Sequence, residues 1–225
     1  MNGYCFKTLT LGAFWVIENL IFDLDGTLWD STGACVRGWN VALTELGISR
    51  KVTDKDLHSI MGMPHEAIYQ KLFPEMTESQ REEVARRTYA EELLTIQSDG
   101  GGRLFPGVSE GIEKLSGRYR LFVVSNCLQD YMDTFFDSSG LKSYFSDWEC
   151  YGNTGNSKAE NIKSVCQRNQ LKESVYIGDT AGDQQAAMGA DLKYFHVNYG
   201  FGEPVYDCWR FDDFVELTKF FLDEG

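Results

Sequence analysis

The stretch Ile21-Phe22-Asp23-Leu24-Asp25-Gly26-Thr27-Leu28 decides how the rest of the chain is interpreted. An apolar run leads into it and stops at two aspartates, which Gly26 and Thr27 follow at once. A short apolar run that ends in turn residues is typical of a buried strand, and parallel α/β sheets bind ligands where their strands end. Because the adjacent carboxylates of Asp23 and Asp25 repel each other, a bound cation or a proton must compensate them. The simpler interpretation is an Asp-Gly turn that only closes a strand.

The composition is that of a globular protein with an acidic surface. The 225 residues are 43% hydrophobic and 24% charged, with a net charge of -13. Such a surface repels nucleic acid and anionic membranes, so neither is expected as a partner. An anionic substrate would need a local positive charge, from a metal or a lysine. No run of about 18 apolar residues suggests a transmembrane helix.

The cysteines and the N-terminus bear on where the protein works. None of the six cysteines forms a C-x-x-C pair, and dispersed cysteines in a chain of this length indicate reduced thiols and a cytoplasmic protein. Residues 1–15 have scattered apolar residues without the continuous run of a signal peptide. We interpret them as an N-terminal extension, either an edge strand or a disordered lead.

Helical spacing dominates the chain from about residue 33 to residue 97. Helices are predicted from Ser31 or Thr32 to Gly47 and at 54–61, 65–73 and 77–96. Three glycines at 100–102 and the loop at 30–33 are interpreted as the two sides of a hinge. We therefore expect residues 31–103 to form an all-helical cap domain, inserted into an α/β core made of residues 16–30 and 104–225.

Strands and helices alternate after residue 104. Strands are predicted at 120–124, 144–151, 174–177 and 193–197. Helices are predicted at 108–115, 130–136, 157–168 and 214–222, and one that begins at Thr180 or Asp183 and ends at Ala190. This alternation predicts an α/β fold: a Rossmann-like core of parallel strands with right-handed crossovers and helices on both faces.

Four polar clusters follow these strands or begin these helices. They are Asp23 with Asp25, Ser125 with Asn126, Lys158, and Asp179 with Asp183. Because parallel strands end at one edge, we expect the clusters to meet there. Carboxylates are preferred ligands of Mg²⁺, loop N–H groups and a hydroxyl hold phosphate, and a lysine stabilises phosphoryl oxygens. An aspartate can attack phosphorus while a second acid transfers protons.

These clusters resemble the haloacid dehalogenase-like hydrolase superfamily. The superfamily has a D-x-D-G-T motif, a Ser/Thr motif, a Lys motif and a G-D-x-x-x-D motif, and all four occur here in that order between residues 16 and about 203. The order differs from that of response-regulator receivers, in which the lysine comes after the later Ser/Thr strand. The helical insertion resembles a type 1 cap, as in phosphoglycolate phosphatase, β-phosphoglucomutase and phosphonatase.

The resemblance implies a role for each residue. Asp23 resembles the nucleophile and a Mg²⁺ ligand, and Asp25 the general acid/base that gives the metal its backbone carbonyl. Ser125 and the Asn126 backbone resemble the phosphate-binding groups. Lys158 resembles the residue that orients Asp23 and neutralises the phosphoryl group. Asp179 resembles the third protein ligand of Mg²⁺, and Asp183 a supporting group.

Some features depart from the family pattern or remain open. The chain has Ser157-Lys158-Ala159 where many relatives have Lys-Pro-x-Pro, which weakens the match to the phosphoglycolate branch. Asp25 argues against dehalogenation, which needs no second acid. His65 falls where relatives often place a basic substrate contact, but it can also be a surface histidine at the start of a helix.

The function predicted from the sequence is a Mg²⁺-dependent phosphatase. It would hydrolyse a small phosphorylated metabolite through an aspartyl-phosphate on Asp23. One alternative is a phosphomutase of the β-phosphoglucomutase type, in which a sugar phosphate accepts the phosphoryl group. Another is a non-catalytic, phosphate-binding regulatory protein. The sequence is compatible with a monomer or a homodimer.

Overall fold

The computed structural model describes residues 16–63, 65–98 and 102–224. The predicted extension at 1–15 and two of the three hinge glycines lie outside these residues.

The core of the fold is one six-stranded parallel sheet. Its order is β5-β4-β1-β6-β7-β8. The strands are β1 Asn19–Phe22, β4 Arg120–Ser125, β5 Phe145–Cys150, β6 Ser174–Gly178, β7 Lys193–Val197 and β8 Trp209–Phe211. The central strand β1 pairs in parallel with both β4 and β6. The predicted α/β fold with a parallel sheet is therefore confirmed, and β8 is an edge strand that the sequence patterns did not indicate.

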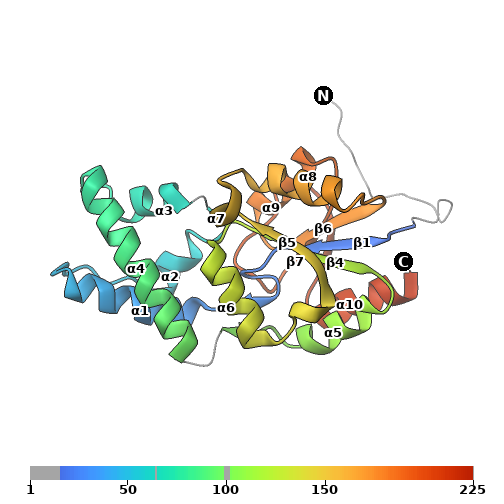
Figure 1. Cartoon of the computed structure of the whole chain (residues 1–225), viewed down its shortest axis with the longest axis horizontal. Helices are drawn as coiled ribbons and strands as arrows, with labels where there is room; N and C mark the ends of the chain where they lie inside the picture. Colours follow the sequence, from blue (N-terminus) through green and yellow to red (C-terminus); the bar gives the residue numbers. More distant parts are fainter. Residues whose placement is uncertain (1–15, 64, 99–101, 225) are drawn as a thin grey trace.

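Successive residues of β1 pack on opposite faces of the sheet. Leu20 and Phe22 belong to one apolar cluster, whereas Ile21 belongs to another. A strand buried on both faces has this continuous apolar sequence. Helices α8 and α9 lie above the sheet and α5 and α10 below it in Figure 1, so helices cover both faces. The helices around the sheet are α5 Val108–Ser116, α6 Gln129–Ser139, α7 Tyr151–Thr154, α8 Lys158–Arg168, α9 Ala181–Gly189 and α10 Phe214–Glu224, with a 3₁₀ turn at Lys142–Tyr144.

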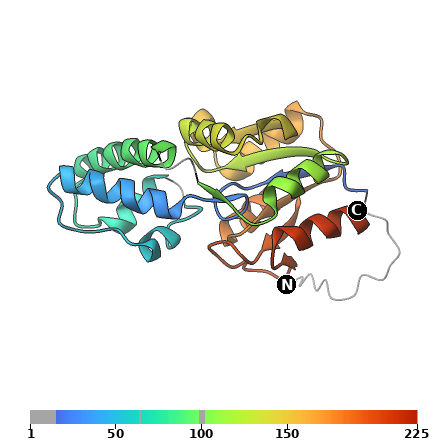
Figure 2. The same ribbon diagram turned by 90° about the horizontal axis from the view of Figure 1, so that it is seen from below.

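Four helices lie to one side of the sheet, and we call them the cap helices (Figures 1 and 2). They are α1 Thr32–Glu45, α2 Asp54–His58, α3 His65–Leu72 and α4 Glu78–Ser98. Helix α2 ends three residues earlier than the predicted Met61, because the chain turns there and reaches Gly62 at a positive φ of 74°. Trp39 of α1 stacks on Tyr69 of α3 with ring centroids 5.3 Å apart, so the cap helices have apolar packing of their own.

The two chain segments that join the cap helices to the sheet pair with each other. Strands β2 Trp29–Asp30 and β3 Arg103–Leu104 are antiparallel, with Asp30 opposite Arg103. Trp29 is fully buried and packs edge-on against Tyr131 and Phe135 of α6. The entry to the cap helices and the exit from them therefore lie side by side.

Two further sequence features can be compared with the structure. Within residues 16–63, 65–98 and 102–224, no helix is both long and apolar enough to cross a membrane. The five cysteines of these residues are free thiols, as expected for reduced cysteines.

Candidate active site

The loop after β1 brings the first and the last motif together. Gly26 has a φ of +83°, and a Cβ built on it would lie 2.2 Å from Oδ2 of Asp179. Only glycine fits there, because a side chain would meet both the left-handed backbone and that carboxylate. The next residue, Thr27, donates a hydrogen bond from its hydroxyl to Oδ1 of Asp179 over 3.2 Å. The Gly-Thr pair of the first motif therefore positions Asp179 next to Asp23.

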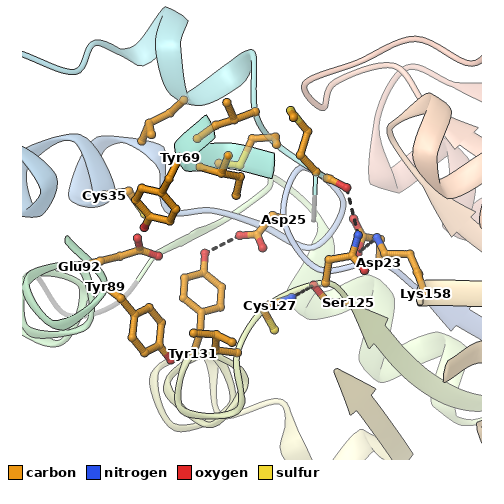
Figure 3. Close-up of a pocket in the computed structure, with 18 residues that line it drawn as sticks. Asp23, Asp25, Cys35, Tyr69, Tyr89, Glu92, Ser125, Cys127, Tyr131 and Lys158 are labelled. Carbon is orange, nitrogen blue, oxygen red and sulfur yellow. Dashed lines mark hydrogen bonds and ion pairs between the residues drawn. The ribbon is translucent and has the colours of Figure 1, made fainter. Parts of the chain in front are cut away.

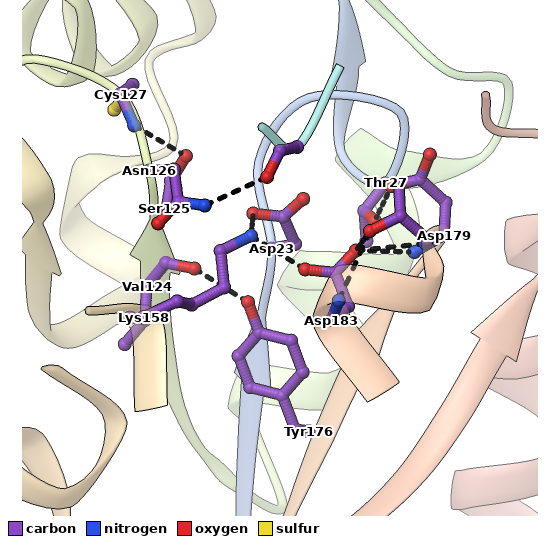
Figure 4. Close-up of polar contacts among 12 residues, drawn as sticks. Asp23, Thr27, Val124, Ser125, Asn126, Cys127, Lys158, Tyr176, Asp179 and Asp183 are labelled. Atoms are coloured by element: carbon purple, nitrogen blue, oxygen red, sulfur yellow. Dashed lines mark hydrogen bonds and ion pairs between the residues drawn. The ribbon is translucent and has the colours of Figure 1, made fainter. Parts of the chain in front are cut away.

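A cavity of about 130 Å³ lies between the ends of the central strands and the cap helices (Figure 3). Asp23, Asp25, Ser125, Asn126 and Lys158 line its core side. The sequence-predicted residues therefore share one cavity, except Asp179 and Asp183, which lie directly behind Asp23 (Figure 4).

Lys158 joins two of the carboxylates. Its Nζ donates to Oδ1 of Asp23 over 2.8 Å and to Oδ1 of Asp183 over 2.6 Å (Figure 4). The lysine is the first residue of α8, and its N-cap Ser157 forms a capping box with Glu160 that fixes where the helix begins. The side chain of Lys158 is only 6% exposed, so the ammonium interacts with these carboxylates through a medium of low dielectric constant.

Three buried carboxylates form a group that suits a divalent metal. One oxygen each from Asp23, Asp179 and Asp183 lie within 4.8 Å of one another. An all-oxygen, strongly acidic donor set fits Mg²⁺ better than it fits a softer metal. Asp183 is also held from behind, because its Oδ2 accepts hydrogen bonds from the backbone N–H and the hydroxyl of Thr180. Asp179 is held in the same way, by the hydroxyl of Thr27 and the backbone N–H of Phe201, so the three carboxylates form a fixed acidic group.

The pKa values of these residues are shifted because several negative charges lie close together. Burial and the carboxylate of Asp183 raise the pKa of Asp23 to about 7, although Lys158 opposes the shift. Burial, Asp183 and Asp23 also raise the pKa of Asp179 well above its usual value. Burial lowers the pKa of Lys158, but its two carboxylate partners outweigh this and raise it overall. A further positive charge is thus favoured beside Asp23 and Asp179.

Asp25 points away from this group and towards the cavity. Its Oδ1 accepts hydrogen bonds from Tyr131 and, over 3.1 Å, from the indole N–H of Trp29 (Figure 3). Burial raises its pKa to about 6, against the lowering effect of these two donors. A carboxyl group with a pKa near neutrality can both give and accept a proton. Tyr131 was not foreseen, because it lies in the helical pattern of α6, which carries no motif.

The second motif lies at the end of β4. The Ser125 hydroxyl accepts a hydrogen bond from the backbone N–H of Cys127 over 3.2 Å. The side-chain amide of Asn126 donates to the backbone oxygen of Gly62 over 3.0 Å (Figure 4). The Asn126 side chain thus links the predicted phosphate-binding loop to the cap helices, a contact that the sequence did not indicate.

The remaining candidate and the missed residues belong to the cap helices. His65 begins α3, and its side chain lies outside the described part of the chain. The sequence did not predict Cys35, Tyr69 or Glu92 as pocket residues, but they line the cavity from the side of the cap helices (Figure 3). Each lies within a cap helix, where the spacing of apolar residues does not reveal a polar pocket residue.

Comparison with known proteins decides the family. The family described as "Haloacid dehalogenase-like hydrolase" matches residues 20–197. This chain belongs to that family. Phosphoglycolate phosphatase from Nitrosospira multiformis is 27% identical over 209 residues, covering 85% of this chain and 89% of its own. The phosphoglycolate phosphatase of Aquifex aeolicus is 26% identical, covering 88% of this chain and 95% of its own.

Solved structures of the haloacid dehalogenase-like family share the fold. A haloacid dehalogenase-like family hydrolase from Streptococcus pneumoniae superposes with a TM-score of 0.79 at 23% identity, covering 91% of this chain and 98% of its own. CbbY from Rhodobacter sphaeroides, solved in complex with xylulose-1,5-bisphosphate, has a TM-score of 0.76 at 17% identity and covers 90% of this chain and 96% of its own. Together with the sequence relatives, the family match makes this haloacid dehalogenase-like protein a phosphatase of the phosphoglycolate phosphatase-like branch.

Proposed function

We propose that this haloacid dehalogenase-like protein is a Mg²⁺-dependent phosphatase that hydrolyses a small phosphorylated metabolite through an aspartyl-phosphate on Asp23. The observation that carries the proposal is the position of Asp23. Its Oδ1 is held by the ammonium of Lys158, and no described residue donates a hydrogen bond to its Oδ2. Since a nucleophile needs one oriented oxygen free to attack, this arrangement suits covalent catalysis.

Each residue then has a defined task. Oδ2 of Asp23 attacks phosphorus and the bond to the ester oxygen breaks, while Asp25 gives its proton to the departing alkoxide. Asp25 next removes a proton from water, which attacks the phosphorus of the aspartyl-phosphate and releases inorganic phosphate and free Asp23. Lys158 and the Ser125 hydroxyl hold the phosphoryl oxygens, whose charge is spread over the equatorial positions.

The proposed metal would be held by the carboxylates of Asp23 and Asp179 and by the backbone oxygen of Asp25. Asp183 would hold Lys158 in position beside the metal, because its carboxylate accepts hydrogen bonds from Lys158 and from Thr180. Bound Mg²⁺ supplies positive charge that offsets the crowded carboxylates and the negative phosphoryl group.

The test measures phosphate release from p-nitrophenyl phosphate. The purified protein should release phosphate with Mg²⁺, lose this activity with EDTA, and regain it when excess Mg²⁺ is added. Asp23→Asn should have no measurable turnover. Activity that survives both EDTA and Asp23→Asn would contradict the proposal.

The two alternatives from the sequence have distinct outcomes. A phosphomutase would convert one sugar-phosphate isomer into another without net phosphate release, which NMR detects. A folded protein that binds Mg²⁺ and phosphate but never turns over would be regulatory. The contact of Lys158 with Asp23 supports an enzyme over a regulatory protein. A phosphomutase would use the same residues for its first step, so the NMR experiment separates it from the phosphatase. The cytoplasmic location and the oligomeric state, monomer or homodimer, stay predictions.

A further inference from the structure

The far wall of the cavity, opposite Asp23, is formed by the cap helices. Cys35 of α1, Tyr69 of α3 and Glu92 of α4 lie there, together with apolar side chains (Figure 3). Because the predicted phosphate-binding groups lie on the core side, a phosphate ester bound to them would direct its alcohol part at this wall. The volume of about 130 Å³ is below the roughly 300–1,000 Å³ typical of sites for larger ligands, so this alcohol part is small.

Glu92 is the charged residue of that wall. Its Oε2 accepts a hydrogen bond from the indole N–H of Trp39 over 2.5 Å, which fixes the carboxylate at the cavity. The thiol of Cys35, beside Glu92 on the same wall, also donates a hydrogen bond to the carboxylate. Burial raises the pKa of Glu92 to about 7, and Asp25 across the cavity adds to the rise. A carboxylate has about four lone-pair sites, so besides these two donors it can accept a further hydrogen bond from a ligand in the cavity.

Positive charge is scarce in the cavity. Among its described lining residues, Lys158 is the only cation, and it is already bonded to Asp23 and Asp183. Arg81 and Arg86 of α4 do not line the cavity but an adjoining groove beyond Tyr69 and Tyr89, where Arg86 is paired with Glu83. A carboxylate on the substrate would thus face Glu92 and Asp25 with no described cation to pair with, which is unfavourable in a buried site.

We propose that Glu92 selects phosphate esters whose alcohol part presents hydrogen-bond donors and carries no negative charge. The donors are hydroxyl or ammonium groups, from which the carboxylate of Glu92 accepts a hydrogen bond. The inference rests on the proposed phosphatase function, and it separates this chain from an enzyme that favours the anionic ester phosphoglycolate.

Substrate comparison tests the proposal. The probes are phosphoethanolamine, which has an ammonium, glycerol 2-phosphate, which has neutral hydroxyls, and phosphoglycolate, which has a carboxylate. We expect kcat/KM for one or both donor esters to exceed that for phosphoglycolate at least ten-fold. The leading ester then shows whether the donor is an ammonium or a hydroxyl. Equal or better turnover of phosphoglycolate would overturn the proposal.

A charge substitution at Glu92 tests its role. Glu92→Gln keeps the shape but removes the charge, and we expect it to reduce the ratio of donor-ester to phosphoglycolate kcat/KM at least ten-fold, mainly through KM for the donor esters. The matched control is Glu91→Gln, since Glu91 is the adjacent residue and pairs with Arg87 instead. It should leave the ratio within two-fold of the wild type. An unchanged ratio in Glu92→Gln would contradict the role of Glu92.

Two more measurements keep the outcomes separate. If Glu92→Gln does not unfold cooperatively, a measurement on the wild type takes its place: inhibition by ethanolamine and by glycerol is compared with inhibition by glycolate. Stronger inhibition by glycolate would overturn the proposal. His65→Ala should not alter the preference, and a large change would assign selection to that histidine instead. If no ester, including p-nitrophenyl phosphate, is hydrolysed with Mg²⁺, the phosphatase function fails; if only the preference is wrong, the selection by Glu92 alone fails.

Discussion

Lys158 is bound to the proposed nucleophile and to Asp183 at the same time, so its removal affects the most acidic part of the molecule. In Lys158→Ala the carboxylates of Asp23 and Asp183 lose the ammonium that bonds both, and Asp179 beside them loses a nearby positive charge. We expect kcat for p-nitrophenyl phosphate to fall by about 10²-fold or more. Mg²⁺ should raise the Tm more in this variant than in the wild type, because the metal replaces the lost charge. Calorimetry with Mg²⁺ and with EDTA measures the difference.

The control for this prediction is Lys158→Arg. It keeps the positive charge, but its planar guanidinium cannot reproduce the two hydrogen bonds of a compact ammonium. In EDTA, Lys158→Arg should recover most of the Tm that Lys158→Ala loses, while its kcat stays low. A variant with alanine at 158 that retains wild-type kcat would show that the lysine only stabilises the fold.

His196 makes the stability depend on pH. It is fully buried in β7 beside the Tyr194 hydroxyl, 3.0 Å from Nδ1, and burial with nearby Arg210 lowers its pKa to about 4. Its unfolded pKa is about 6.5, so the unfolded state binds this proton more readily and the contribution to stability is lost as pH falls from 6.5 to 4. Between pH 7 and pH 5 the wild type should lose about 1–2 kcal/mol more unfolding free energy than His196→Asn.

Urea unfolding at the two pH values measures this loss. Asp23 and Asp25, whose pKa values are raised to about 7 and about 6, also titrate in this range with the opposite sign, so only the difference between the two proteins isolates His196. Curves that change in parallel with pH would show that His196 is not protonated in the unfolding reaction.

At the scale of single residues, the sequence predicted the catalytic side of the site and not its far wall. Asp23, Ser125 and Asp179 each follow an apolar run, and parallel pairing of those strands places their ends together. Glu92 and Tyr131 were missed because they point into the cavity from long helices. In a helix, the spacing of polar and apolar residues does not distinguish a solvated face or a core position from a pocket.

At the scale of elements, the close packing of α1 on α4 depends on Gly38. A Cβ at this position would lie 2.6 Å from the backbone oxygen of Glu91, so α4 would have to move. Gly38→Ala should therefore reduce the unfolding free energy by about 1–3 kcal/mol. Because Glu92 follows the displaced carbonyl, KM for the preferred ester should also rise. Chemical denaturation and steady-state kinetics measure the two effects.

Gly33→Ala is the matched control in the same helix. Gly33 is exposed, and a Cβ there would meet only the end of the Arg37 side chain at 3.5 Å. Alanine favours a helix over glycine by roughly 0.5–1 kcal/mol, so this variant should be as stable as the wild type or more stable. Equal losses in both variants would contradict the close-packing argument.

Elements with a strong local pattern were predicted, and those fixed by distant partners were not. The Leu121-Phe122-Val123-Val124 run of β4 and the spacing in α1 identify a buried strand and an amphipathic helix without further help. Strand β8 has only Trp209, Arg210 and Phe211, and it exists because β7 offers a free edge to pair with. Strands β2 and β3 are two residues each and form because the chain leaves and re-enters the sheet region at the same place.

At the scale of the whole molecule, we propose that the cap helices form a separable unit inserted between Asp30 and Arg103. These two residues face each other in an antiparallel pair, so a two-residue Asn-Gly hairpin could replace residues 31–102. The shortened protein should unfold cooperatively, since the six-stranded sheet and its covering helices remain intact. It should still hydrolyse p-nitrophenyl phosphate with Mg²⁺, but with kcat lower by roughly ten-fold or more, because water is no longer excluded from Asp25.

The same protein should no longer distinguish the donor esters from phosphoglycolate, because Glu92 is lost while Asp23, Lys158 and Asp179 are retained. Asp23→Asn in the shortened protein serves as the control, and it should have no activity. A shortened protein that aggregates or unfolds without a cooperative transition would show that the sheet needs the cap helices for stability. One that keeps the wild-type preference would place substrate selection on the core side of the cavity instead.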